Sequence, residues 1–251
     1  MRKKGLLTIM LASMFMLTGC EKLDLFLGSE PGSNPTTETD NDTKPTGDGL
    51  FSVSPTLKVR FAPGNLVYTD GVGYSFAPNQ YDYGGYFGWG TGSNPNNTST
   101  NYADYQTFND WGNYISGGWR TLSIDEWEYL LNERHGKKGV SIVCGVHGMV
   151  LLPDNWSGGE FSVGFDGWNA NYYDAESWKE MEESGAVFLP ASGYRIGTDM
   201  GDVGTEAIYW SSTPDGARYA HQVNFTDYYV GGHYSYSERQ FGISVRLVQN
   251  Y

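Results

Sequence analysis

Histidine, cysteine and acidic side chains are the groups most able to do chemistry, and their spacing here matches no established catalytic or metal motif. The four histidines, His135, His147, His221 and His233, show no HExxH or related spacing. Zinc needs clustered ligands at set spacing, which neither the histidines nor the two cysteines provide. The sequence also lacks a G-x-S-x-G elbow, an S-x-x-K motif and a phosphate loop. We therefore predict no metal, no cofactor and no catalytic residue, although a carboxylate pair for glycoside hydrolysis stays open.

Cys20 is the residue whose chemistry is clearest. Three basic residues, Arg2 to Lys4, precede an apolar run from Leu6 to Leu17, which is shorter than the roughly 20 residues of a membrane-spanning helix. The run ends in Leu17-Thr18-Gly19-Cys20, which resembles the bacterial lipobox. This resemblance implies removal of residues 1–19 and attachment of acyl chains such as palmitate to Cys20. The alternative is a short buried helix that ends in cysteine.

The lipobox resemblance implies an outer-membrane lipoprotein. Its anchor should be firm, because two or more acyl chains hold a protein to a membrane. Acidic residues just after the anchor, Glu21 and Asp24, favour export to the cell surface. Residues 20–50 are predicted to be the lipidated N-terminus and a tether. Residues 28–49 contain no aromatic or aliphatic side chain, so they cannot bury enough apolar surface to fold. Such a segment spans about 25 Å as a random coil.

The net charge argues against two classes of partner. The formal charge of −13 becomes −16 once the three basic residues of the signal segment are removed. An excess of negative charge is unfavourable for contact with nucleic acid or anionic lipid. We expect the membrane to be reached only through the lipid anchor.

Residues 51–251 are predicted to form a single domain. Leu57, Val59 and Phe61 alternate with polar residues, and so do Ile243, Val245 and Leu247, which predicts a first and a last strand that pair with each other. A capping box over Ser123–Glu126 predicts one helix, and Asp174 with a stop at Gly185 predicts a second. Two helices with short antiparallel strands indicate an α+β domain.

Four segments that follow one another in order carry a resemblance to a known family. They are Trp119–Ser123, Phe188–Arg195, Tyr209–Thr213 and Phe241–Val248. Their order resembles the Fibrobacter succinogenes major paralogous domain and related Bacteroidetes surface proteins, including the variable proteins of diversity-generating retroelements. The resemblance covers residues 51–251 and is strongest from Trp119 onward. It implies a C-type lectin-like fold in which the terminal strands pair and a long loop region contacts the ligand.

The resemblance also places the ligand surface between Asp215 and Gln240, with Ala220, Val223 and Phe225 in the core. Tyrosine supplies a rigid contact area, while asparagine and serine supply adaptable hydrogen bonds, as in antibody loops. Any single tyrosine could instead be an ordinary strand residue. The predicted ligand-binding residues are Arg218, Tyr219, His221, Asn224, Asp227, Tyr228, Tyr229, His233, Tyr234 and Tyr236.

The sequence departs from the sugar-binding C-type lectins and from their enzymatic relatives. It has no EPN or QPD loop, and Asp110 precedes Trp111 rather than following it in a WND segment. Calcium-dependent sugar binding is therefore not predicted. Formylglycine-generating enzymes use a cysteine pair, whereas Cys144 is the one cysteine after Cys20.

We predict a lipid-anchored, non-enzymatic module for recognition or adhesion at the cell surface, with a protein or carbohydrate ligand. Three alternatives remain. The first is a structural accessory or tip subunit of a surface appendage. The others are an enzyme that acts on polysaccharide and a formylglycine-generating-like enzyme. A retroelement that diversifies the ligand surface is a further hypothesis.

Overall fold

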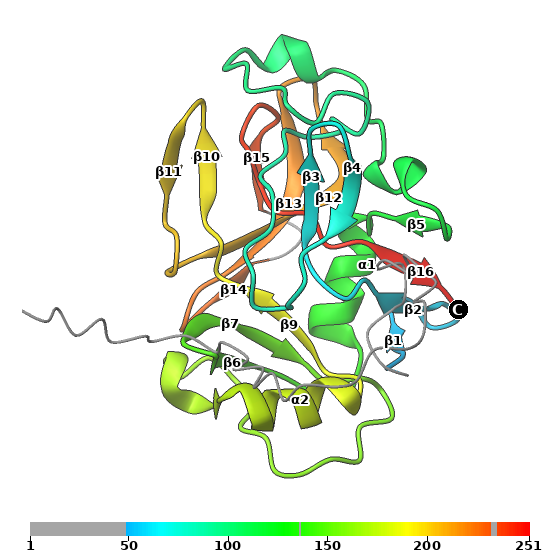
Figure 1. The fold of residues 1–251 in the computed structure, drawn as a ribbon. Coiled ribbons are helices and arrows are strands. Elements are labelled where there is room, and N and C mark those ends of the chain that lie inside the picture. Colours follow the sequence, from blue (N-terminus) through cyan, green and yellow to red (C-terminus); the bar gives the residue numbers. More distant parts are fainter. Residues whose placement is uncertain (1–48, 136, 232–234) are drawn as a thin grey trace, which may run out of the picture.

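The computed structural model describes residues 49–135, 137–231 and 235–251 (Figure 1). Cys20, the signal segment, nearly all of the tether, and the predicted ligand residues His233 and Tyr234 lie outside these ranges. No helix in the described ranges has the length and apolar character needed to cross a membrane.

Strands dominate the described residues, which form sixteen strands and two α-helices. The strands of the first half are β1 (Phe51–Ser52), β2 (Lys58–Phe61), β3 (Leu66–Thr69), β4 (Gly73–Phe76), β5 (Trp119–Arg120), β6 (Lys138–Val143), β7 (Val146–Leu151) and β8 (Tyr172–Tyr173). Those of the second half are β9 (Val187–Pro190), β10 (Tyr194–Ile196), β11 (Asp199–Gly201), β12 (Ala207–Asp215), β13 (Tyr219–Phe225), β14 (Val230–Gly231), β15 (Tyr236–Glu238) and β16 (Val248–Asn250). The helices are α1 (Ile124–Glu128) and α2 (Ala175–Glu183), with a π-helical turn η3 (Tyr129–Glu133) and 3-10 turns η1 (Tyr102–Tyr105), η2 (Trp111–Tyr114) and η4 (Trp168–Ala170).

The predicted α+β, C-type lectin-like fold is wrong. The described chain is mostly β-sheet in several sheets, and its two helices span only five and nine residues. The physical reason lies in the composition of the segments between the helices. Short runs of aromatic and β-branched residues, separated by glycine turns, favour brief strands over helix. The two helix caps are present, but the helices they begin form only a small part of the domain.

The strands form three four-stranded sheets and two hairpins. One sheet has the order β1-β2-β16-β5, and a second has the order β8-β6-β7-β9 with α2 beside it (Figure 1). The third contains β12, β13 and β14, and β15 also pairs with β13. The hairpins are β3–β4 and β10–β11. Figure 1 shows the β6–β9 sheet at one end of the molecule and the loop that carries η1 at the other.

The pairing of an early strand with a late one is present between β2 and β16, which run antiparallel with Phe61 opposite Val248. The late strand begins later than its alternation predicts. Ile243, Val245 and Leu247 are completely buried, but they precede the strand and fill the core as extended chain. The backbone N–H of Leu66 donates to the carbonyl of Val245 at 2.9 Å. The hydrophobic alternation therefore predicted correctly which side chains are buried, but it predicted the extent of the paired strand only in part.

Both helices begin where their caps predict. The Ser123 hydroxyl accepts from the backbone N–H of Glu126, and the Glu126 carboxylate accepts from the backbone N–H of Ser123, so the capping box is complete. The Asp174 carboxylate accepts from the N–H of Ser177 at 2.9 Å, and α2 ends before Gly185, whose φ is +91°. Because α1 passes into the π-helical η3 after five residues, it is shorter than its apolar pattern indicates.

The four segments that carry the family resemblance contact one another in the core. Their hydrogen bonds join Ile124 N to Thr213 Oγ1 at 3.0 Å, Tyr209 Oη to Pro190 O at 3.0 Å, and Ser192 Oγ to Ser244 Oγ at 2.8 Å. All of these residues except Ile124 belong to the motifs, and Ile124 immediately follows the first of them. The motifs thus build part of the scaffold of the domain.

Arg246 is the most deeply buried charged side chain in the described residues, with 1% of its surface exposed. Its guanidinium donates to Asn65 Oδ1 at 3.2 Å and to Gln80 Oε1 at 2.5 Å. Burial lowers the pKa of Arg246 to about 10. Gln80 also donates to Glu182 Oε1 at 2.9 Å, so the Gln80 amide links the Arg246 guanidinium to a carboxylate on α2 through hydrogen bonds. This network ties the β12 region of the core to the α2 layer.

Candidate ligand-binding site

The predicted ligand residues divide between the two ends of β13. Ala220, Val223 and Phe225 are buried as predicted; of the side chains between them, Gln222 is also buried, whereas His221 and Asn224 are partly exposed. Tyr219 begins the strand and Phe225 ends it, which separates the two ends by about 20 Å at the rise of an extended chain. The expected single surface is therefore two separate regions, which we call the loop end and the turn end.

The loop end gathers Arg218, Tyr219 and Tyr236. The rings of Tyr219 and Tyr236 meet edge to face at 5.2 Å, and Tyr236 is 54% exposed. The Arg218 guanidinium forms an ion pair with Glu238. It also lies 5.5 Å from the ring centre of Tyr102, a residue that the sequence prediction did not include. Tyr102 belongs to η1 and so brings a distant loop to this end of β13.

That loop runs from Gly88 to Asn109 and is pinned to the sheet by Arg239. The buried Arg239 side chain donates to Tyr105 O and Gln106 O, both at 3.3 Å. It also donates to Gly216 O at 2.6 Å and Tyr219 O at 3.0 Å. Burial lowers the pKa of Arg239, yet these four carbonyls solvate its charge. One arginine thus joins the loop, the β12–β13 turn and β13.

Buried aromatic side chains hold the same loop from within. The Trp89 ring lies 4.3 Å from the Arg239 guanidinium carbon, and its indole N–H donates to Ser211 O at 3.0 Å. The Tyr105 hydroxyl donates to Ser99 O at 2.8 Å. Gly88 must lack a side chain, because a Cβ there would lie 2.1 Å from the Tyr105 ring. A long irregular loop fixed this firmly is typical of a functional segment.

The loop forms an open polar hollow of about 280 Å³ at the surface, which we call the loop cavity. Its lining includes Ser93, Asn94, Thr107 and Asn109, whose side chains make no hydrogen bond to any residue in the described ranges. Asp104 is the one charged side chain in the lining, and its carboxylate accepts from Ser99 Oγ at 2.5 Å. The loop cavity therefore offers uncommitted hydroxyl and amide groups next to the loop-end tyrosines.

The turn end holds Asn224, Asp227, Tyr228 and Tyr229. Both polar groups of the Asn224 side chain are already hydrogen-bonded within the protein: the amide N–H donates to Glu206 Oε1 at 2.6 Å, and the oxygen accepts from Ser235 Oγ at 2.9 Å. Tyr228 is 77% exposed and Tyr229 49% exposed. The carbonyl of Asp227 accepts from Gly167 N at 3.0 Å, which fixes the backbone of this turn.

His221 lies between the two ends. Its Nδ1 is 3.3 Å from Ser235 O, so this histidine is partly engaged by its own sheet. His147 stacks on Trp168 at 5.1 Å and its Nδ1 is 2.8 Å from Gly204 O, which makes it part of the packing. Searching the described residues for groups of three or more metal-ligating side chains finds none.

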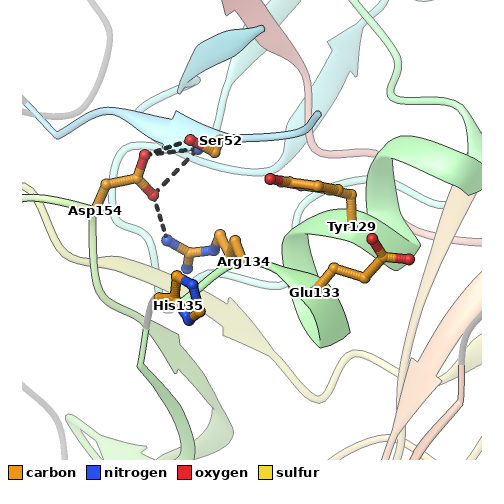
Figure 2. Close-up of a pocket in the computed structure, with 6 residues that line it drawn as sticks. All are labelled: Ser52, Tyr129, Glu133, Arg134, His135 and Asp154. Atoms are coloured by element: carbon orange, nitrogen blue, oxygen red, sulfur yellow. Dashed lines mark hydrogen bonds and ion pairs between the residues drawn. The ribbon is translucent and has the colours of Figure 1, made fainter. Parts of the chain in front are cut away.

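A second cavity, of about 300 Å³, lies between β1, η3 and the end of β7 (Figure 2). Asp154 lines this cavity, and its carboxylate accepts from Ser52 Oγ at 2.6 Å and pairs with Lys58 and Arg134 at 3.1 Å each. Tyr129, Glu133 and His135 complete the lining. Figure 2 shows Asp154 and Arg134 turned toward each other across this space.

The pKa of Asp154 indicates that the carboxylate in the cavity of Figure 2 has a structural role. Burial raises the pKa of Asp154, but hydrogen bonds from Ser52, Lys58 and Arg134 outweigh it and hold the pKa below its usual value. Glycoside hydrolysis needs one carboxyl whose pKa is raised so that it can act as an acid. Asp154 has the opposite property, and its oxygens are already occupied.

The sequence prediction did not include the loop cavity, because it placed the ligand surface in one continuous tyrosine-rich stretch, residues 215–240. A signal for it was present. Between Ser93 and Asn109 the chain carries five asparagines besides serines and threonines, with no apolar periodicity. Loops of that length without regular structure are uncommon, and most are either functional or disordered. What the sequence could not provide was the distance between Tyr102 and Arg218, which only the fold sets.

Comparison of the chain with protein-family models, curated proteins and solved structures yields no match.

Proposed function

We propose that this chain is a lipid-anchored recognition or adhesion module of the outer bacterial surface, which binds a protein or carbohydrate at the loop end of β13. The observation that carries the proposal is the loop cavity, a preformed polar hollow beside exposed tyrosines. Binding sites are commonly concave and largely preformed, with a few polar groups that fix orientation. Tyr102 and Tyr236 add rigid contact area at the same end.

Anchoring through Cys20 is the second part of the proposal and rests on the lipobox resemblance. Cells that express the full chain are fed an alkyne-tagged fatty acid, and the chain should carry the tag. Cys20→Ala should abolish tagging and leave the protein at its precursor length. Protease added to intact cells should degrade the wild-type chain if the anchor faces outward. An untagged wild-type chain would contradict the lipoprotein assignment.

Recognition is tested with the full-length protein in mild detergent on arrays of glycans and extracellular proteins. We expect binding to at least one ligand, and loss of that binding in a Tyr102→Ala, Tyr236→Ala double variant. Tyr228→Ala with Tyr229→Ala is the matched control, because it removes two exposed tyrosines from the turn end. Equal loss in both double variants would place the site elsewhere.

A structural role in a surface appendage is the second candidate, and one observation favours it. The β10–β11 hairpin stands away from the other sheets in Figure 1 and exposes Ile196 and Met200 by 39% and 47%. Exposed apolar side chains on a projecting hairpin suit contact with another subunit. Chemical cross-linking on intact cells tests this, since a partner linked through residues 194–201 would support it.

A further inference from the structure

We propose that the loop cavity binds a single neutral sugar ring, the terminal or side-branch unit of a glycan. This inference rests on the proposed recognition function and narrows its ligand class. It adds a binding site formed by residues 89–109, none of which belongs to the tyrosine-rich stretch.

The hydrogen-bonding groups of the cavity match a polyol. Ser93 and Thr107 contribute hydroxyls, and Asn94 and Asn109 contribute amides, which together both donate and accept. Sugar hydroxyls have the same dual character, so each can meet a donor or an acceptor in the lining. Since these four side chains have no partner among the described residues, a ligand does not need to break internal hydrogen bonds. It displaces only water.

The charge of the lining favours a neutral ligand. No lysine, arginine or histidine lines the cavity, so a carboxylate, sulfate or phosphate would find no counter-charge there. Its one carboxylate, Asp104, accepts from Ser99 Oγ and is the only acidic group in the lining, whereas a divalent cation such as Ca²⁺ takes several oxygen ligands. The overall charge of the chain also repels anions at long range.

Size and polarity disfavour a peptide side chain as the occupant. A volume of about 280 Å³ lies at the lower limit of small-molecule sites, which suits one ring better than an extended chain. The aromatic residues of the wall are closed off, since Trp89 is 3% exposed and Tyr105 2%. A protein hot spot would need an open apolar pocket for an aromatic or aliphatic anchor. The open aromatic surface belongs instead to Tyr102, which is 39% exposed and directly precedes five consecutive lining residues.

The loop that forms the cavity is preorganised, which favours binding through a small number of neutral hydrogen bonds. The loop is held by the four hydrogen bonds of Arg239 and by the buried rings of Trp89 and Tyr105. Binding therefore orders little additional chain, and that saving lets a few neutral hydrogen bonds suffice. Affinity for one ring should be modest, with firm adhesion arising from many anchored copies on one cell.

The test uses the full-length protein in mild detergent on one array that carries neutral glycans, sialylated or uronate-containing glycans, and extracellular proteins. We expect binding to neutral glycans, weakened about tenfold or more in an Asn94→Ala, Asn109→Ala double variant, since two hydrogen bonds are lost. Asn155→Ala is the control, because this exposed asparagine lies in the loop after β7 and outside the cavity lining. Circular dichroism checks that each variant stays folded.

Each outcome separates the two proposals. Binding to proteins alone, or stronger binding to acidic glycans, overturns the neutral-sugar inference and leaves the recognition function standing. Glycan binding that Asn155→Ala weakens as much as the double variant overturns the assignment to the loop cavity. Absence of any ligand on the array overturns both. If the double variant unfolds, Thr107→Val removes one hydroxyl at an exposed position with little change in volume, and unchanged glycan affinity in that variant overturns the inference.

Discussion

The two ends of β13 carry similar exposed tyrosines but differ in what surrounds them. At the loop end, Tyr236 packs edge to face on Tyr219, and Arg239 ties the neighbouring loop to four carbonyls. At the turn end, Tyr228 is exposed more than any other tyrosine in the described chain, and the loop cavity is a strand's length away. The difference teaches that composition alone does not define a binding surface, because preorganised surroundings decide how much contact energy is retained on binding.

A buried cation at the loop end explains why a long polar loop can stay ordered there. Polar loops gain little from apolar burial, so their order depends on specific hydrogen bonds. Arg239 supplies these from inside, and its charge is solvated by backbone carbonyls and by the face of Trp89. At the turn end the comparable role falls to Asn224, a neutral side chain with one donor and one acceptor contact. The expected effects of mutation differ accordingly.

Arg239→Ala should produce the largest effect. It leaves four carbonyls without their donor and removes the stack on Trp89, so we expect a loss of about 3 kcal/mol in the free energy of unfolding. Ligand affinity should fall by about two orders of magnitude, because the loop cavity loses its support. Urea denaturation and glycan binding measure the two effects.

Arg218→Ala is the matched control for that change. This arginine lies at the same end, but its side chain is 52% exposed and its main partner is the ion pair with Glu238. Exposed ion pairs contribute between about 0 and 1 kcal/mol, so its loss should barely shift the urea midpoint. If both variants lose the same stability, Arg239 does not pin the loop.

Replacing tyrosines in pairs should sharpen the comparison directly. Tyr102→Ala with Tyr236→Ala should weaken ligand binding about tenfold or more, since exposed aromatic residues beside a cavity act as contact anchors. Tyr228→Ala with Tyr229→Ala should leave the affinity within about twofold. Titration of the ligand found on the array gives both values. A larger loss from the turn-end pair would exchange the roles of the two ends.

Local features of this chain could be predicted from sequence where one residue type has one physical role. The capping box at Ser123 and the stop at Gly185 depend on neighbours in the chain, whereas the buried positions Ala220, Val223 and Phe225 were predicted from the family resemblance. The fold class and the site depend on contacts between distant segments. Tyr102 meets Arg218 across more than a hundred residues, and no periodicity encodes that approach. Strands of two to four residues are also too short to show a clear hydrophobic alternation, so the sequence indicates the two capped helices more strongly than it indicates the strands.

The cavity of Figure 2 supplies the smallest predicted effect and a test of the claim that binding belongs to the loop end. The pKa of Asp154 is lowered in the folded state, so the stability that this carboxylate contributes is complete above its unfolded value near about pH 4 and is lost as the pH falls through the folded value. Asp154→Asn should therefore flatten the acid limb of the Tm profile and lower Tm at neutral pH by roughly 2–4 °C. Asp199→Asn, at an exposed position in the β10–β11 hairpin, is the control and should change neither the acid limb nor Tm at neutral pH.

Because Asp154 joins β1 to η3 through Ser52 and Arg134, away from the loop cavity, glycan affinity at pH 7 should be unchanged in Asp154→Asn. Loss of affinity in Asp154→Asn without unfolding would mean that this joint takes part in binding, and the contrast between the two ends of β13 would no longer account for it.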